Sequence, residues 1–268
     1  MNVRQTVKMR ITTRVQRRDF AIWLTALWMG AGFAQSWASV DTPLHVDQEA
    51  RSAQPRKVVL LHGLVRNPGS MQKLAKTLAA AGHRTCNVAY PSRRYTIEEL
   101  TLTHVRPAIT ACFGTDPGPL DFVTHSLGGI IVRQLAATGD SITIGRVVML
   151  SPPNQGSQIV DKLGHWGLFK LINGPAGNQL GTDPAQLPHT LGPAGFELGV
   201  ITGNRSINWI LSLLIPGDDD GKVSIENAKL EGMRDFLVVP STHTFIMKSR
   251  AVQAQVLHFL AHGCFQEV

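Results

Sequence analysis

One serine of this chain stands in a setting that could make its hydroxyl a nucleophile. Ser126 lies in Thr124-His125-Ser126-Leu127-Gly128, between an apolar run and a segment with helical spacing. This pentapeptide is close to the G-x-S-x-G pattern of a sharp strand-to-helix turn, which exposes the serine hydroxyl and needs small residues two positions to either side. Gly128 meets that need, whereas Thr124 stands where the pattern has glycine. By itself the match is a weak signal, and its place between a strand and a helix strengthens it.

A serine nucleophile needs an imidazole base with a carboxylate behind it. His243 follows the last apolar run, and an acidic turn of three consecutive aspartates, 218–220, precedes it. We expect His243 as the base and one of the three aspartates as the acid, with Asp220 and Asp218 as the candidates, because only one of the three can face the imidazole. A calcium loop is a competing use of the acidic turn, but EF-hand ligands alternate along the chain. No metal site is therefore predicted, and a solvated turn is expected for the other two aspartates.

A second segment could supply the hydrogen-bond donors that acyl transfer needs for its developing oxyanion. The apolar run 58–61 ends in His62-Gly63-Leu64. We expect the backbone N–H groups of Leu64 and Leu127 to form the oxyanion hole. The alternative is a strand that merely turns at Gly63.

The elements that must position these residues alternate between strand and helix along the chain. Short apolar runs predict strands at 57–61, 84–90, 120–124, 146–150, 198–202 and 235–239. Helical spacing predicts helices at 70–81, 96–112, 127–137 and 245–262. This alternation predicts an α/β fold with a mostly parallel sheet of about six strands flanked by helices. The carboxyl ends of parallel strands meet at one edge, so Ser126, Asp220 and His243 should lie at the same edge.

Two excursions interrupt this alternation. The segment 151–195 is rich in Gly, Pro and Asn, and it is too long for an ordinary connection of about 2–6 residues. We expect it to form a lid-like insertion, and a second apolar cluster precedes the acidic turn. The only tryptophans after residue 38 are Trp166 and Trp209, one in each excursion. Trp166, Phe169 and Trp209 are therefore predicted to bind an apolar acyl chain, with ordinary core packing as the alternative.

The first 38 residues have the composition of a cleaved export signal. A basic stretch precedes a 14-residue apolar run, Ala21 to Ala34, which is shorter than the roughly 20 residues that span a membrane. Small residues then permit cleavage after Ala38, and Arg17-Arg18 resembles the twin-arginine signature. The alternative is a buried N-terminal helix. We expect an exported, periplasmic or secreted protein, with a lead-in segment at 39–56 and one domain at 57–268.

Composition and charge narrow the function class further. Hydrophobic residues make up 43% and charged residues 17%, so the chain can bury a core. The net charge of +7 resides mostly in residues 1–38, which hold six basic side chains and one acid. The remaining 20 basic and 18 acidic groups nearly cancel. Nucleic acid is therefore excluded as a partner, and no cofactor is predicted.

The order of these motifs resembles the α/β-hydrolase fold, in particular its small bacterial exported lipases and esterases. The resemblance covers roughly residues 57–262, with a trimmed N-terminus, and the segments that carry it are HGL, THSLGG, DDDGKV, STH, YPSR and SPPNQGS. It implies a serine hydrolase that cleaves small-molecule or lipid carboxylic esters through an acyl-enzyme, with transient contact to a lipid surface. The pattern of the family also favours Asp220, shortly before Val223, as the acid, with Asp218 as the alternative. An acyltransferase or thioesterase would use the same triad, and a catalytically silent binding protein would share the fold.

Two smaller expectations follow from the expected fold. Cys86 begins a strand and Cys112 ends the helix that returns from it, so we expect both at the edge opposite the site, joined by a disulfide. Cys264 would then remain unpaired. Arg93 and Arg94 follow the same strand on the site edge. They could bind an acidic head group, although a solvated loop is the simpler interpretation.

Overall fold

The computed structural model of the chain describes residues 9–10, 55–139, 142–207 and 212–267. Of the predicted export signal and lead-in segment, it covers Met9, Arg10, Pro55 and Arg56 alone. Trp209 lies outside the described residues. Among those that are described, no helix is long and apolar enough to cross a membrane.

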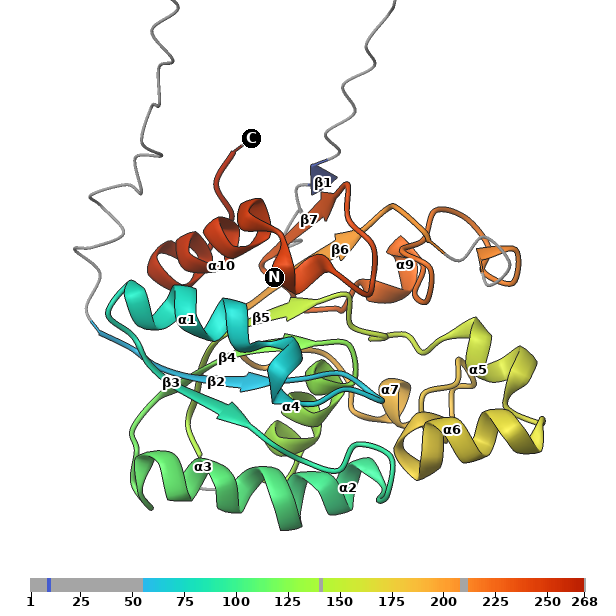
Figure 1. Cartoon of the computed structure of the whole chain (residues 1–268), viewed down its shortest axis with the longest axis horizontal. Coiled ribbons are helices and arrows are strands. Elements are labelled where there is room, and N and C mark those ends of the chain that lie inside the picture. Colours follow the sequence, from blue (N-terminus) through green and yellow to red (C-terminus); the bar gives the residue numbers. More distant parts are fainter. Residues whose placement is uncertain (1–8, 11–54, 140–141, 208–211, 268) are drawn as a thin grey trace, which may run out of the picture.

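One parallel sheet forms the centre of the molecule (Figure 1). Its strands are β1 (Met9–Arg10), β2 (Lys57–Leu61), β3 (Arg84–Val88), β4 (Leu120–His125), β5 (Ile144–Leu150), β6 (Leu198–Gly203) and β7 (Asp235–Val239). They are arranged in the order β1-β7-β6-β5-β4-β2-β3, and every pair is parallel. The six strands from β2 to β7 are those predicted from the sequence. The two-residue strand β1, which pairs with β7, was not predicted.

The central strands are mostly apolar because helices cover both faces of the sheet. In β2, Val58 and Leu60 pack on one face and Val59 and Leu61 on the other, and all four are completely buried. β4 and β6 are likewise buried at every position. Since successive side chains alternate between faces, the sheet separates two hydrophobic cores.

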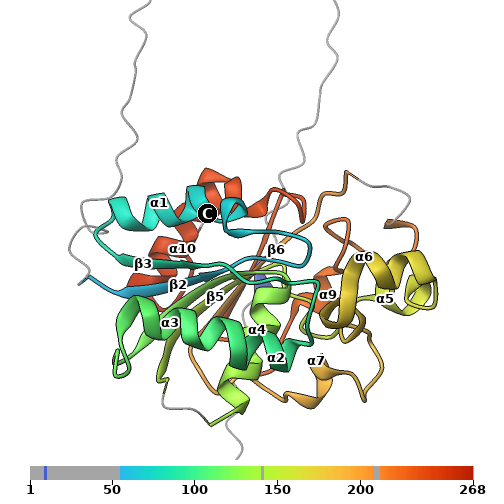
Figure 2. The same ribbon diagram turned by 60° about the horizontal axis from the view of Figure 1, so that its bottom comes forward.

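The helices form a layer on each side of the sheet (Figures 1 and 2). One layer holds α1 (Gln72–Ala80) and α10 (Arg250–His262), with the 3₁₀ turns η2 (Pro68–Ser70) and η4 (Ile246–Lys248) before them. The other holds α2 (Ile97–Glu99), the π-helical turn η3 (Leu100–Val105), α3 (Arg106–Phe113) and α4 (Leu127–Ala137). The predicted capping box of Thr96 and Glu99 begins α2. The single helix predicted over 96–112 is therefore divided, and its π turn ends at Val105, two residues before Pro107, which has no amide hydrogen to donate.

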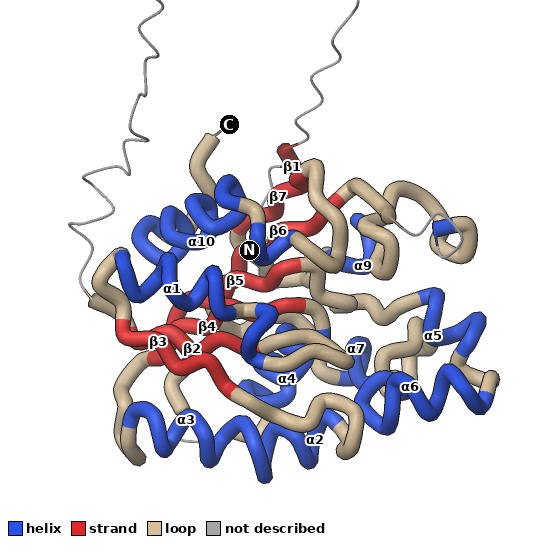
Figure 3. The backbone as a smooth tube through the Cα atoms, viewed as in Figure 1, coloured by secondary structure: helices blue, strands red, loops and turns tan. Residues whose placement is uncertain are grey.

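The long connections lie beside the carboxyl ends of the strands (Figure 3). The insertion between β5 and β6 contains α5 (Gln158–Leu163), α6 (Gly167–Asn178) and α7 (Leu187–Thr190), and α9 (Ile225–Ala228) lies between β6 and β7. Arg133 of α4 anchors the insertion by donating hydrogen bonds to the carbonyl oxygens of Asn154, Pro188 and Gly192. Burial lowers the pKa of Arg133 to about 10, so the guanidinium remains charged at neutral pH.

The predicted disulfide is present between Cys86 of β3 and Cys112 of α3, and Cys264 is free and exposed. The two joined cysteines are 26 positions apart. Closing a loop of this size should stabilise the fold by about 3 to 4 kcal/mol, chiefly by restricting the unfolded chain. We therefore expect a Cys86→Ala/Cys112→Ala variant to lose about this free energy of unfolding in urea titrations, and Cys264→Ala to lose almost none. Equal stability of the two variants would contradict the assignment.

Candidate active site

Ser126 occupies a strained turn between β4 and α4. β4 ends at His125, α4 begins at Leu127, and Ser126 between them has φ 52° and ψ −120°. A positive φ is unfavourable for a residue with a side chain and tends to persist where the surrounding structure enforces it. The Ser126 N–H donates to the Leu150 carbonyl at the end of β5 (2.9 Å), which helps to hold the turn. The backbone geometry is that of a nucleophile elbow.

Two glycines allow the chain to pass close to this elbow. A Cβ at Gly128 would lie 2.6 Å from the carbonyl oxygen of Leu61, the last residue of β2. A Cβ at Gly63 would lie 2.7 Å from His125 Nδ1 and 3.1 Å from the Ser126 Cβ. Thr124, where the pattern has glycine, is completely buried at the end of β4. The elbow is therefore closely packed at Gly128 and holds a threonine two residues before Ser126.

We expect Gly128→Ala to lower the free energy of unfolding by about 1–3 kcal/mol, as overpacking does in well-packed interiors. The added methyl would meet strand backbone, which cannot move aside as a flexible side chain can. Gly195→Ala is the matched control, because nothing lies within 4 Å of a Cβ built there. Urea unfolding of both variants tests this expectation, and a Gly128→Ala protein as stable as Gly195→Ala would contradict it.

His243 and Asp220 form a buried pair. His243 lies in the loop after β7, and its Nδ1 is 2.9 Å from Asp220 Oδ2. The side chains are 5% and 0% exposed, so little water competes for this bond. The backbone joins the same loops, since the His243 N–H donates to the Asp220 carbonyl oxygen (2.9 Å). The arrangement leaves His243 Nε2 as the ring nitrogen that could accept a proton.

The Asp220 carboxylate is held in its charged form. Burial alone would raise its pKa, but the charge and hydrogen bond of His243 outweigh burial, so the pKa lies below its usual value. Its other oxygen, Oδ1, accepts hydrogen bonds from the N–H groups of Lys222 (3.1 Å) and Val223 (2.9 Å). A carboxylate bonded in this way can orient an imidazole and stabilise its positive charge.

The neighbouring aspartates are engaged elsewhere or face solvent. Asp219 Oδ1 accepts hydrogen bonds from the Ser212 hydroxyl (2.8 Å) and from the Gly221 N–H (2.6 Å). Asp218 is exposed. Of the three aspartates that the sequence left as candidates, Asp220 is the one whose carboxylate contacts His243. No group of three or more metal-binding side chains occurs in the described part of the chain.

His125 connects the elbow to the His243 loop. Its Nε2 is 2.9 Å from the His243 carbonyl oxygen, and the two rings are 4.9 Å apart between centroids. Burial, and then the charge of His243, hold the pKa of His125 well below its usual value, so this ring is neutral and its Nε2–H donates. His243 therefore lies against the residue that directly precedes Ser126. Among the described residues the Ser126 hydroxyl makes no hydrogen bond, and such contacts often form only when substrate is bound.

The predicted oxyanion loop lies against the elbow. Leu127 is the first residue of α4, where a backbone N–H has no partner within the helix. Leu64 follows Gly63, which the built-Cβ distances place beside Ser126. Val65, with φ 57°, donates its N–H to the Ser92 hydroxyl (3.1 Å). The loop that carries Leu64 is thus held by the loop after β3.

His62 has a structural role in the same loop. Its Nδ1 is 2.9 Å from the Gly63 carbonyl oxygen, and its ring stacks on Tyr90 with centroids 4.0 Å apart. The Tyr90 hydroxyl donates to the His62 carbonyl oxygen. These contacts further fix the loop that carries Leu64.

The insertion places apolar side chains at the surface. Trp166 immediately precedes α6 and is 59% exposed, its ring edge-on to His165. Phe169 is half-buried in α6. Leu168 and Leu171 of the same helix are 70% and 72% exposed. Neither Trp166 nor Phe169 is fully buried, and the third predicted substrate residue, Trp209, lies outside the described residues.

Comparison with known proteins identifies the family. A sequence model described as the Alpha/beta hydrolase family matches residues 58–242, more than half of the chain. The chain belongs to the alpha/beta hydrolase family. Comparison with curated protein sequences gave no significant match. The family, the parallel sheet and the elbow all agree with the resemblance found in the sequence.

Solved structures similar to this hydrolase include lipases and esterases. The mature form of the lipase BlEst2 from Bacillus licheniformis is 18% identical with a TM-score of 0.57, and the match covers 78% of this chain and 91% of that one. Phospholipase PlaB from Legionella pneumophila is 18% identical with a TM-score of 0.55. The match covers 65% of this hydrolase but only 45% of PlaB. A metagenomic carboxyl esterase, MGS0156, is 18% identical with a TM-score of 0.50, over 78% of this chain and 71% of that one. At such identities these similarities establish the fold.

Two basic residues close to the candidate active site of this hydrolase were not predicted from the sequence as part of it. The charges of Arg66 and Lys222 both act on His125, the neighbour of Ser126, and lower its pKa. Arg66 follows the predicted oxyanion residue Leu64 by two positions, and Lys222 follows Asp220 by two. Their spacing from the motifs was the available signal, but a single basic residue in a loop is ordinarily solvated.

Proposed function

We propose that this hydrolase cleaves carboxylic esters, with Ser126 as nucleophile, His243 as general base and Asp220 as the acid behind it. The arrangement of Ser126, His125, His243 and Asp220 is the main support for this proposal. A serine in a strained elbow is preceded by His125, and His125 packs against a histidine whose Nδ1 is bonded to a buried aspartate. This order of groups is what acyl transfer by serine requires.

The reaction would proceed in two halves. Ser126 Oγ attacks the ester carbonyl while His243 Nε2 takes the hydroxyl proton, and the N–H groups of Leu64 and Leu127 stabilise the oxyanion. The alcohol departs with the proton that His243 returns, which leaves an acyl-enzyme. Water then attacks the acyl carbonyl with His243 again as base, and the acid and Ser126 are regenerated. Asp220 keeps Nδ1 protonated throughout and stabilises the imidazolium.

The apolar surface of α6 suits the acyl part of an amphiphilic substrate. We propose that Trp166, Phe169 and Trp209 contact acyl chains, and that the exposed leucines of α6 make transient contact with aggregated lipid. Apolar side chains exposed together beside a reactive centre are typical of sites that bind apolar ligands. The lipase and phospholipase among the similar structures agree with this assignment.

An active-site label combined with an ester series tests the proposed function. A fluorophosphonate probe should label the protein at Ser126, identified by peptide mass mapping. 4-Nitrophenyl esters of increasing chain length should be hydrolysed, with free acid as the main product when alcohols are added. Acyl transfer to the added alcohol as the main reaction would assign a transferase instead. If the probe does not label the protein and no ester is hydrolysed, the protein is a catalytically inactive member of the family.

We further propose that residues 1–38 are an export signal. The Cys86–Cys112 disulfide supports this proposal, because such bonds persist in oxidising compartments. Removal of the signal would also remove β1 and leave β7 as an edge of the sheet. Mass spectrometry of the protein expressed in a bacterial host should find a chain that begins at Ser39 in the periplasm. An intact N-terminus in the cytoplasm would contradict the proposal.

A further inference from the structure

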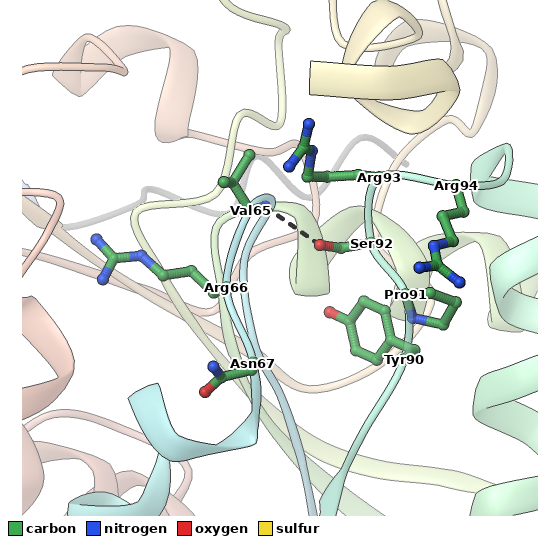
Figure 4. Close-up of a pocket in the computed structure, with 8 residues that line it drawn as sticks. All are labelled: Val65, Arg66, Asn67, Tyr90, Pro91, Ser92, Arg93 and Arg94. Atoms are coloured by element: carbon green, nitrogen blue, oxygen red, sulfur yellow. Dashed lines mark hydrogen bonds between the residues drawn. The ribbon is translucent and has the colours of Figure 1, made fainter. Parts of the chain in front are cut away.

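A cleft with basic walls opens beside the loop that carries Leu64. It has a volume of about 540 Å³ and is lined by residues of the loops after β2 and β3. Figure 4 shows that Arg66 comes from one wall and that Arg93 and Arg94 come from the other, with the bond between Val65 and Ser92 joining the walls. None of the described residues that line the cleft is acidic. The described lining of the cleft therefore contains three arginines and no carboxylate.

The described part of the chain does not neutralise these charges. In the described ranges, none of Arg66, Arg93 and Arg94 forms an ion pair. Arg93 Nη2 donates to the Leu171 carbonyl oxygen (3.1 Å), a neutral acceptor that leaves the charge uncompensated. Arg93 and Arg94 are exposed and Arg66 is half-buried. An anion that entered the cleft would therefore meet three arginines and no competing carboxylate among the described lining residues.

The position of the cleft links it to the reactive centre. The Arg66 N–H donates to the Gly63 carbonyl oxygen (3.3 Å), so Arg66 belongs to the same turn as Leu64. Its charge also lowers the pKa of His125, the residue before Ser126. On the opposite wall, the bond from Arg93 to Leu171 places the cleft next to the exposed apolar face of α6. A ligand that spans both surfaces would have an anionic head and an apolar tail.

We propose that the cleft binds the phosphate group of an amphiphilic ester substrate, with Arg66, Arg93 and Arg94 as its ligands. The inference rests on the proposed ester hydrolysis at Ser126 and specifies its substrate class. Phosphate is favoured over carboxylate because donors from two walls suit a tetrahedral anion with several free oxygens, whereas a carboxylate is planar and presents two. Guanidinium groups form strong, often bidentate hydrogen bonds with phosphate.

A binding experiment that needs no catalysis tests the site. Octyl phosphate contains no carboxylic ester, so its affinity for the intact protein, measured by isothermal titration calorimetry, is independent of the proposed hydrolysis. It should bind at least tenfold more tightly than octyl glucoside, which has the same chain and a neutral head. Arg66→Gln and Arg94→Gln should each weaken octyl phosphate binding by about tenfold, since each removes a charge-assisted contact. Higher ionic strength should weaken it further.

Arg84→Gln is the matched control. Arg84 begins β3, at the end of that strand remote from the cleft, and its side chain is exposed, as that of Arg94 is. This variant should bind octyl phosphate as the unmodified protein does. Equal affinities for octyl phosphate and octyl glucoside, or equal losses in Arg84→Gln and Arg66→Gln, would overturn the proposal. Inorganic phosphate that binds as tightly as octyl phosphate would indicate a site for free phosphate and would overturn the substrate assignment.

A kinetic experiment then tests whether phosphate binding in the cleft promotes ester hydrolysis. We expect 1-decanoyl-glycerol 3-phosphate to be hydrolysed with a kcat/KM at least tenfold above that of 1-decanoyl-glycerol. In Arg66→Gln this ratio should fall by about tenfold. A ratio near one in the unmodified enzyme would overturn the phosphate subsite and leave ester hydrolysis standing. If neither ester is cleaved and Ser126 is not labelled, the proposed function fails, and binding of octyl phosphate still decides whether the cleft recognises phosphate.

Discussion

Ser126→Ala should lower kcat for ester hydrolysis by about 10⁶-fold, the loss observed when the nucleophile of a serine triad is removed. Without the hydroxyl no acyl-enzyme can form, and His243 has no proton to take. The residual rate would come from oxyanion donors and substrate binding alone. The measurement is kcat on a short-chain 4-nitrophenyl ester, together with loss of labelling by the fluorophosphonate probe.

Folding must be intact for this result to count. Ser126 has a φ of 52°, which is as unfavourable for serine as it is for alanine. The substitution should therefore leave the fold, and its circular dichroism spectrum, unchanged. Ser70→Ala, in the 3₁₀ turn η2, is the control and should retain full activity. Appreciable hydrolysis by a folded Ser126→Ala protein would end the proposal that this serine is the nucleophile.

Asp220→Asn should lower kcat by about 10⁴-fold while the fold persists. The carboxamide has nearly the shape of the carboxylate, so Oδ1 can still accept from the Val223 N–H. It carries no charge to stabilise the His243 imidazolium, and its NH₂ group would favour the wrong imidazole tautomer. The measurement is kcat on the same ester, with the free energy of unfolding determined alongside.

The neighbouring aspartate provides the matched comparison. Asp218→Asn alters the same acidic turn, but the Asp218 side chain is exposed and does not contact His243. Its kcat should stay within twofold of the unmodified enzyme. Similar losses in Asp218→Asn and Asp220→Asn would mean that the overall charge of the turn, rather than one oriented carboxylate, supports the reaction.

Much of the fold could be predicted because its signals are local. Most strands from β2 to β7 are short, largely apolar runs between turn-forming residues, and burial on both faces of the sheet favours such a composition. β2 and β7 begin and end at the predicted residues. The division of the helix around Pro107 was missed, because helical spacing does not distinguish a π turn from a regular one.

The elbow could also be predicted, since it depends on neighbours along the chain. A strand, a serine and a small residue two positions later suffice to indicate it, and Gly128 is required by the close approach of the Leu61 carbonyl. The disulfide followed in turn from the order of strand and helix. Neither inference needed the position of a distant side chain.

The sequence by itself determined the order of the elements, the sheet and the three segments that carry Ser126, Asp220 and His243. Only the tertiary structure decided which aspartate contacts the imidazole, because that choice depends on hydrogen bonds that engage Asp219 within its own turn. It likewise decided that Arg66 shares a cleft with Arg93 and Arg94. Periodicity and composition indicate which residues of one segment are buried. Which side chains from separate loops come into contact depends on how the whole chain packs.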